Sequence, residues 1–148
     1  MMTNSRILWG DDMNAEFVIH AEPTGKARPR VTRFGAYTPK KTKQYEDLVK
    51  AEYISQCLGT DFGDSALEIY VCAFYPIPKS ASKAKREKML SGEIRPTKKP
   101  DYDNICKAIC DALNGLAYKD DAQIVEAHCH KYYGEIPMVK VTIEEVEG

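Results

Sequence analysis

Four aspartates and one lysine in the C-terminal half of the chain have residue types and spacings that suit metal-assisted hydrolysis. Asp101 and Asp103 are two residues apart, Lys107 follows them, and Asp120 and Asp121 come later as a pair. Carboxylates this close repel one another unless a cation neutralises them, and Mg²⁺ prefers a few carboxylate oxygens while it keeps waters for substrate phosphates. The pattern therefore predicts a phosphodiester-cleaving centre, in which a bound ion lowers the pKa of a water and orients it for attack.

The first two aspartates directly precede a predicted helix, where the chain is extended. In an extended segment residues i and i+2 face the same way, so the carboxylates of Asp101 and Asp103 are expected to reach one ion. Asp103 also suits a second role as the N-cap of the helix. Capping explains one aspartate, but it explains neither the other nor the later pair.

Lys107 shares one helical face with Asp103 and Asp111, at intervals of four residues. One interpretation is a solvated ladder of salt bridges. The other places Lys107 beside the metal pocket, where it holds the scissile phosphate or stabilises the charge that develops on it. The two interpretations differ in whether Asp120 and Asp121 fold back onto this face, which a short loop and a returning strand permit.

Two basic segments suit binding to a polyanion, although the formal net charge is only −1. Residues 26–50 and 79–99 each contain eight Lys or Arg and two Asp or Glu. This segregation favours a phosphate-binding face over an evenly solvated surface, and Phe34 and Tyr37 offer rings for stacking on an unpaired base. The alternative is a charged loop that serves solubility alone. The candidate DNA-binding residues are Lys26, Arg28, Arg30, Arg33, Lys40, Lys41, Lys98 and Lys99.

Length and composition favour one globular domain, because the chain has 148 residues, of which 43% are hydrophobic and 29% charged. No apolar run approaches the ~20 residues of a membrane span. The N-terminus has no secretory signal pattern, so we expect a cytoplasmic protein without a membrane partner. Neither a P-loop nor a dinucleotide-binding glycine motif occurs, which argues against a nucleotide cofactor.

Five scattered cysteines without a CxxC pair are typical of reduced thiols in the cytosol. Cys106 and Cys110 are one helical turn apart, and His128 and His130 share one face of a predicted strand. A Cys₂His₂ zinc site is therefore an alternative. Its spacing matches no common zinc pattern, and buried cysteines that act as small hydrophobic side chains are favoured.

The predicted elements mix strands and helices. We expect strands at 15–20, 66–75, 123–131 and 137–145, helices at 39–58, 80–91 and from Asp103 onward, a basic loop at 22–30 and a short extended piece at 31–37. This order predicts an α/β or α+β single domain, in which a mixed β-sheet packs with helices. Residues 1–13 are expected to form a flexible tail, and 14–148 the domain.

Apolar periodicity predicts which side of each helix is buried. For 39–58 we expect Thr38 as N-cap, Pro39 in the first turn, and an inner stripe of Leu48, Ala51, Ile54 and Leu58. The helix from Asp103 has a clearer stripe, which comprises Ile105, Ala108, Ile109, Ala112, Leu113 and Leu116. The helix at 80–91 is mostly charged and should lie on the surface.

With these residues in view, the chain resembles the RusA family of Holliday-junction resolvases, small Mg²⁺-dependent endonucleases of phages and prophages. The strongest match is DYDNICKAICDAL at 101–113 together with DDAQIV at 120–125. GKARPR at 25–30 and YTPKKT at 37–42 are similar to N-terminal elements of many phage members. The match spans roughly residues 15–145, so 14–148 is expected to be a RusA-like endonuclease domain.

The resemblance implies that Asp101, Asp103 and Asp121 are metal ligands, that Lys107 is the catalytic lysine, and that Asp120 is a further acid near the metal. It also implies Mg²⁺ as cofactor, with Mn²⁺ as a substitute. The expected partner is branched DNA, a four-way junction that a homodimer resolves by paired symmetric nicks in recombination and repair. Two alternatives stay open: a branched-DNA-binding protein without catalysis, and a metal-dependent nuclease of broader substrate range.

Overall fold

The structure is a computed structural model that describes residues 13–27, 30–37 and 39–146. The predicted N-terminal tail, apart from Met13, lies outside the described residues, as do Arg28 and Thr38. The prediction of Thr38 as N-cap is wrong, because the N-cap is Pro39 and the helix begins at Lys40. Among the described residues, no helix is both long enough and apolar enough to span a membrane.

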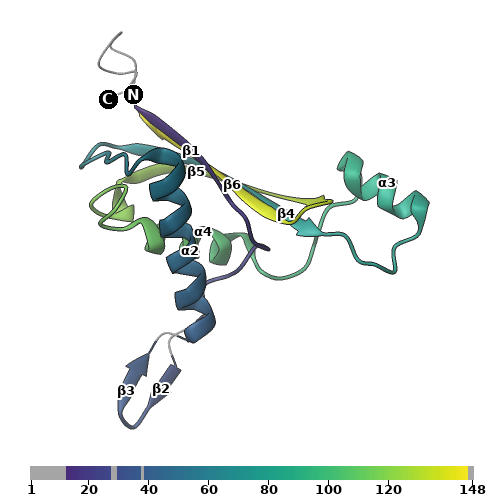
Figure 1. Ribbon diagram of the computed structural model, residues 1–148, viewed down its shortest axis with the longest axis horizontal. Coiled ribbons are helices and arrows are strands. Elements are labelled where there is room, and N and C mark those ends of the chain that lie inside the picture. The colour runs from purple at the N-terminus through teal and green to yellow at the C-terminus, as the bar shows by residue number, and fades with distance from the viewer. Residues whose placement is uncertain (1–12, 28–29, 38, 147–148) are drawn as a thin grey trace.

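A four-stranded mixed sheet forms the centre of the fold (Figure 1). Its strands are β1 (Asn14–Ile19), β4 (Leu67–Pro76), β5 (Ile124–Gly134) and β6 (Met138–Glu145), in the order β1-β6-β4-β5. β5 pairs with β4 in parallel, whereas β6 is antiparallel to both β1 and β4. All four predicted strands are confirmed, and the mixed sheet with helices confirms the α+β class.

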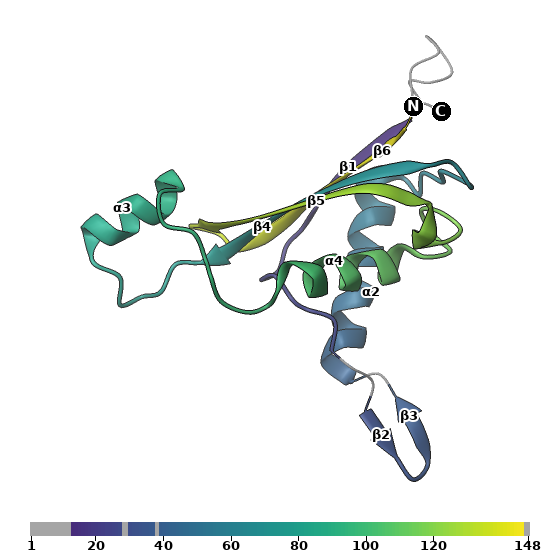
Figure 2. The same cartoon turned by 180° about the vertical axis from the view of Figure 1, so that it is seen from behind.

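The helices are α2 (Lys40–Cys57), α3 (Lys83–Ser91) and α4 (Tyr102–Leu113), with a short 3₁₀ helix η1 (Asp121–Gln123) before β5. Figures 1 and 2 show α2 and α4 on the same face of the sheet, and α3 beyond its end. The expected extended piece is an antiparallel hairpin of β2 (Arg30–Thr32) and β3 (Gly35–Tyr37), which projects beyond α2. Among the described residues, no helix lies on the opposite face of the sheet.

The core lies between the sheet and the two helices that cover it. Alternate residues of β4 are buried, from Leu67 to Tyr75, because side chains of a strand alternate between its faces. The predicted stripe of α4 is confirmed, since its inner residues are all at most 1% exposed, and Leu116 packs against the same cluster. These helical residues are Ile105, Ala108, Ile109, Ala112 and Leu113.

The predicted stripe of α2 is wrong except at Leu48, which is partly buried and packs against the core. The buried residues are Thr42, Tyr45, Val49 and Tyr53, whereas Ile54 is 50% and Leu58 82% exposed and Ala51 faces solvent. The helix instead turns the face with Tyr45 and Tyr53 toward the core, because burying two aromatic rings removes more apolar area from water than burying the aliphatic side chains would. Tyr53 packs edge-on against Phe17 of β1, with ring centroids 5.2 Å apart, and its hydroxyl donates to the carbonyl of Thr60.

Candidate active site

The start of α4 presents two aspartates that do little for the helix. Asp101 occupies the N-cap position in an extended conformation, but its side chain makes no capping hydrogen bond. Oδ1 of Asp103 accepts only a local hydrogen bond, from the backbone N–H of Asn104 at 3.0 Å. The capping role considered for Asp103 is therefore wrong, since the cap position belongs to Asp101. The Asp103 carboxylate lies in the first turn, where it interacts favourably with the helix dipole, but Asp101 makes no side-chain capping bond.

Buried Tyr75 of β4 fixes the backbone directly before these aspartates. Its hydroxyl donates to the carbonyl of Pro100 at 2.6 Å. The preceding linker is held along β5, because Nε of Arg95 donates to the carbonyl of Lys131 at 2.7 Å and Nζ of Lys131 donates to that of Lys98 at 2.7 Å. The sequence analysis did not identify this role of Tyr75, because the alternating pattern of the strand indicates only that the residue is buried.

A cavity of about 380 Å³ brings together three of the predicted site residues, Asp103, Lys107 and Asp121. Tyr102, Cys106 and Cys110 of α4 and Ala127 and Cys129 of β5 line the rest of it. The returning chain therefore does fold Asp121 back onto the face of α4 that carries Lys107, the condition on which the functional interpretation of this lysine depended.

The two neighbouring aspartates of the later pair lie in different surroundings. Asp120 caps η1: its carboxylate accepts from the N–H of Ala122 at 3.4 Å, while its own N–H donates to the side chain of Gln123 at 2.9 Å. Asp121 has its backbone held by the Asn114 side chain, at 2.9 Å. Within the described residues no hydrogen bond or ion pair takes up the Asp121 carboxylate, so it is available to a ligand.

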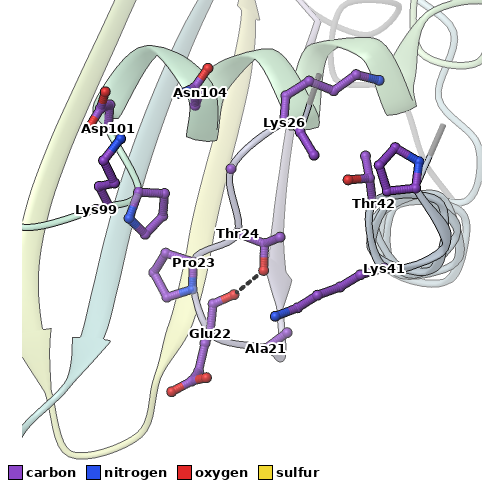
Figure 3. A pocket seen from close by; sticks show the side chains of 14 residues that line it. Ala21, Glu22, Pro23, Thr24, Lys26, Lys41, Thr42, Lys99, Asp101 and Asn104 are labelled. Atoms are coloured by element: carbon purple, nitrogen blue, oxygen red, sulfur yellow. Dashed lines mark hydrogen bonds between the residues drawn. The ribbon is translucent and has the colours of Figure 1, made fainter. Parts of the chain in front are cut away.

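Asp101 lines a neighbouring hollow of about 840 Å³ instead of the cavity with Asp103. Figure 3 shows it beside Lys99, with Lys26, Lys41 and the loop at 21–25 around the same hollow. Within the described part of the chain, Asp101, Asp103 and Asp121 do not form a three-ligand group with mutual distances under 4.8 Å. The expectation that Asp101 and Asp103 face one ion stays a prediction.

One carboxylate links the basic loop to Lys107. Oδ1 of Asp111 is 3.1 Å from Nζ of Lys107, and Oδ2 is 3.3 Å from Nζ of Lys26, which also pairs with Glu46 at 2.6 Å. The hydrogen bond to Asp111 raises the pKa of Lys107, so its ammonium stays charged at neutral pH. For Lys26, burial lowers the pKa, but the bonds to Glu46 and Asp111 outweigh it and the net shift is upward.

The predicted DNA-binding residues lie in three regions. Lys26 is largely buried in its ion pairs, with 21% of its side chain exposed. Lys41 and Lys99 line the hollow of Asp101, and Lys40 and Lys98, next to them in sequence, are exposed. At the hairpin tip, Arg33 stacks over Phe34, which is 87% exposed. Arg28 lies outside the described residues, and Arg30 is described only as backbone of β2.

The Cys₂His₂ alternative is wrong. Ala127 and Cys129 of β5 face the cavity beside Cys106 and Cys110 of α4, whereas His128 and His130 point to the other face of the sheet, opposite Tyr70 and Cys72. The four side chains therefore cannot share one ion. All five cysteines of the chain are free thiols.

Comparison with known proteins agrees with this geometry. The family model described as "Endodeoxyribonuclease RusA" matches residues 20–144, which include every acidic residue of the site. The chain belongs to the RusA endodeoxyribonuclease family. It is also 39% identical over 142 residues to the "Uncharacterized protein YqaN" of Bacillus subtilis (strain 168), covering 90% of this chain and 97% of that relative. The RusA family assignment supports a nuclease among the hydrolases.

Proposed function

We propose that this RusA-family chain is a Mg²⁺-dependent structure-specific endodeoxyribonuclease that resolves four-way DNA junctions by paired symmetric nicks. The observation that carries the proposal is the cavity in which Asp103 and Asp121, from separate elements, face Lys107. Lys41 and Lys99 at the neighbouring hollow and Arg33 on the projecting hairpin favour a long polyanion over a small phosphate ester.

The donor set suits a hard divalent cation. Asp103 keeps one carboxylate oxygen outside its local backbone bond, and the Asp121 carboxylate is not taken up within the described residues. These two side chains would hold the ion, with Asp101 at the adjoining hollow as a third contributor. When bound, Mg²⁺ supplies an activated water and neutralises charge on the scissile phosphate.

Lys107 acts on the phosphate as a cation, because a lysine is protonated at neutral pH and the hydrogen bond to Asp111 raises its pKa further, so the ammonium does not act as a base toward water. Asp111 holds Nζ on the cavity side of α4. Lys107→Ala is expected to lower the cleavage rate on the order of 100-fold and to change junction affinity much less.

A homodimer is the expected active form. A four-way junction has two-fold symmetry, and two opposed nicks require two sites related by the same axis. Sedimentation analysis of the free protein and of the junction complex tests this part. A single copy of the chain on each junction would contradict paired cleavage by one assembly.

The deciding experiment is cleavage of an end-labelled four-way junction in Mg²⁺ and in EDTA, with a linear duplex as control. We expect paired nicks only on the junction and only with Mg²⁺. Asp121→Asn is expected to abolish nicking while binding is retained, whereas Asp120→Asn, at the adjacent capping position, should keep most activity because Asn is an equally good N-cap. Binding without nicks would favour a binding protein, and equal cutting of the duplex a general nuclease.

A further inference from the structure

Three side chains with metal-binding chemistry converge on the sheet face opposite α2 and α4. Glu68 on β4 and Glu126 and His128 on β5 each offer one ligand atom, and these atoms all lie within 4.8 Å of one another. Nε2 of His128 is 2.7 Å from Oε2 of Glu68. Among the described residues, this is the one group of three His, Cys, Asp or Glu side chains that meets this spacing.

An irregularity in the sheet creates the group. Leu67 pairs with Ile124 but Glu68 pairs with Glu126, so Val125 is an extra residue in β5. Without it, Glu126 and His128 would take the register of inward-facing residues, because a slip of one residue turns every side chain to the other face. Bulges of this kind re-aim side chains and are frequent next to functional sites.

The charge at this place favours a cation. Glu68 stands directly opposite Glu126 on one side and Glu144 on the other, and like charges in such cross-strand pairs are destabilising. Within the described residues, no Lys or Arg forms an ion pair with any of these glutamates, and the basic partner of Glu68 is His128. A divalent ion between the carboxylates would relieve this repulsion.

The imidazole is already oriented for ligation. The ring of His128 stacks on that of Tyr70, with centroids 4.5 Å apart and planes 8° from parallel, while Nε2 points to the carboxylate of Glu68. Tetrahedral ligands about 2.0 Å from Zn²⁺ lie about 3.3 Å from one another, so modest side-chain rotations bring these atoms to bonding positions. His128 is 42% exposed, which leaves solvent access for a fourth ligand.

We propose that Glu68, Glu126 and His128 form a binding site for a divalent transition-metal ion such as Zn²⁺ on this face of the sheet. The site is separate from the Asp103 and Asp121 cavity, which faces α4 on the other side. A nitrogen ligand together with two carboxylates selects Zn²⁺, Co²⁺ or Mn²⁺ over Mg²⁺, which prefers oxygen ligands and its own waters.

The test is calorimetric titration of the full chain with Zn²⁺, with Co²⁺ absorption as a second readout. Asp103→Asn with Asp121→Asn in the same chain removes the other centre. In this double variant we expect one Zn²⁺ to bind per chain, and Mg²⁺ to bind at least tenfold more weakly than Zn²⁺. Bound Co²⁺ should give visible absorption bands that change when His128 is replaced. His128→Gln should weaken Zn²⁺ binding at least tenfold.

His130→Gln is the matched control, because His130 lies two residues further along the same face of β5 and outside the group. It should leave Zn²⁺ affinity unchanged. Glu68→Gln serves as a second variant from the other strand and should match the effect of His128→Gln. Equal Zn²⁺ affinity in His128→Gln and in its parent, or equal loss in His130→Gln, would overturn the proposal.

Discussion

Oδ2 of Asp111, near the C-terminal end of α4, lies 3.3 Å from Nζ of Lys26 in the loop that follows β1. The other oxygen of the same carboxylate accepts a hydrogen bond from Lys107 at 3.1 Å. One aspartate thus connects a residue far away in sequence with the lysine of the cavity. It both positions the Lys107 ammonium and raises its pKa, and it needs no metal to do so.

Asp111→Asn is expected to lower junction cleavage about tenfold while affinity for the junction is unchanged or higher. The change releases Lys107 from its partner, so its ammonium is less well positioned on the transition state, and it removes a negative charge near the phosphate. Single-turnover cleavage and equilibrium binding on the same junction measure the two effects.

Asp47→Asn is the matched control. Asp47 forms a similar i,i+4 ion pair with Lys43 on the solvent-exposed face of α2, at 3.7 Å. This variant should cleave as the parent does. If Asp111→Asn also cleaves at the parental rate, Asp111 is part of a merely solvated ion-pair ladder, the alternative that the sequence left open.

The acidic motif was predictable because its spacing is local. Helical periodicity placed Lys107 and Asp111 on one face, and a helix followed by a returning strand brought Asp121 back to it. The sequence did not show which aspartate is the N-cap of α4, because Asp101 and Asp103 both precede Ile105, the first apolar residue of the buried stripe. The hydrogen bonds that separate Asp120 from Asp121 depend on η1, a turn too short to leave a periodic signal.

The outer face of the sheet could not be predicted for a different reason. The alternation of residues along β5 shows which side chains share a face of the sheet. It does not show whether that face is turned toward α4 or away from it. The extra residue Val125 decides that, and only the pairing of β5 with β4 reveals it. The same step sends Cys129 to the cavity and His128 away from it, which separates the residues of the Cys₂His₂ alternative.

The hydroxyl of Tyr45 is buried and, within the described structure, has no hydrogen-bond partner. An unsatisfied buried hydroxyl is costly, so Tyr45→Phe should raise the free energy of unfolding by about 1 kcal/mol. Tyr53→Phe, about two turns further along the same buried face of α2, should lower the free energy of unfolding by about 1 kcal/mol, because the Tyr53 hydroxyl donates to the carbonyl of Thr60. Urea unfolding of both variants checks the opposite signs. Destabilisation by Tyr45→Phe would show that its hydroxyl is satisfied in solution.

Stability should also depend on pH through Glu52 of α2. Its carboxylate accepts from the ring of His20 at 2.6 Å and from the His20 backbone at 3.1 Å. The hydrogen bond from the His20 side chain holds the pKa of Glu52 below its usual 4.5. A lowered pKa contributes stability above the unfolded value, and that contribution is lost as the pH falls through the folded value.

Glu52→Gln should therefore be less stable than the parent near pH 6, and the difference should shrink below pH 4.5. Urea unfolding of the two proteins from pH 6 to pH 3 measures it. The effect is small, as for other partly exposed ion pairs. A difference that stays constant over this range would mean that Glu52 acts through packing instead of its charge.

Gly25 allows the basic loop to lie against the start of α4. A Cβ at this position would be 3.0 Å from Cβ of Pro100 and 3.2 Å from Cβ of Asn104, and the next residue, Lys26, donates its backbone N–H to the Asn104 carbonyl at 2.9 Å. Both contacts involve atoms next to the backbone, so they cannot be relieved by rotating a side chain. An added methyl must displace the loop, the helix start, or both.

Gly25→Ala is therefore expected to cost about 1–3 kcal/mol of stability and to lower cleavage more than binding, because Lys26 moves relative to Asp111 and the linker that holds Asp101 shifts with Pro100. Thr24→Ser, one residue earlier, keeps the hydroxyl that donates to the Glu22 carbonyl and adds no atom, so it should behave as the parent does. Unfolding and single-turnover cleavage of both variants separate the two effects. Normal cleavage by a destabilised Gly25→Ala would show that this close approach supports the fold but does not position the site.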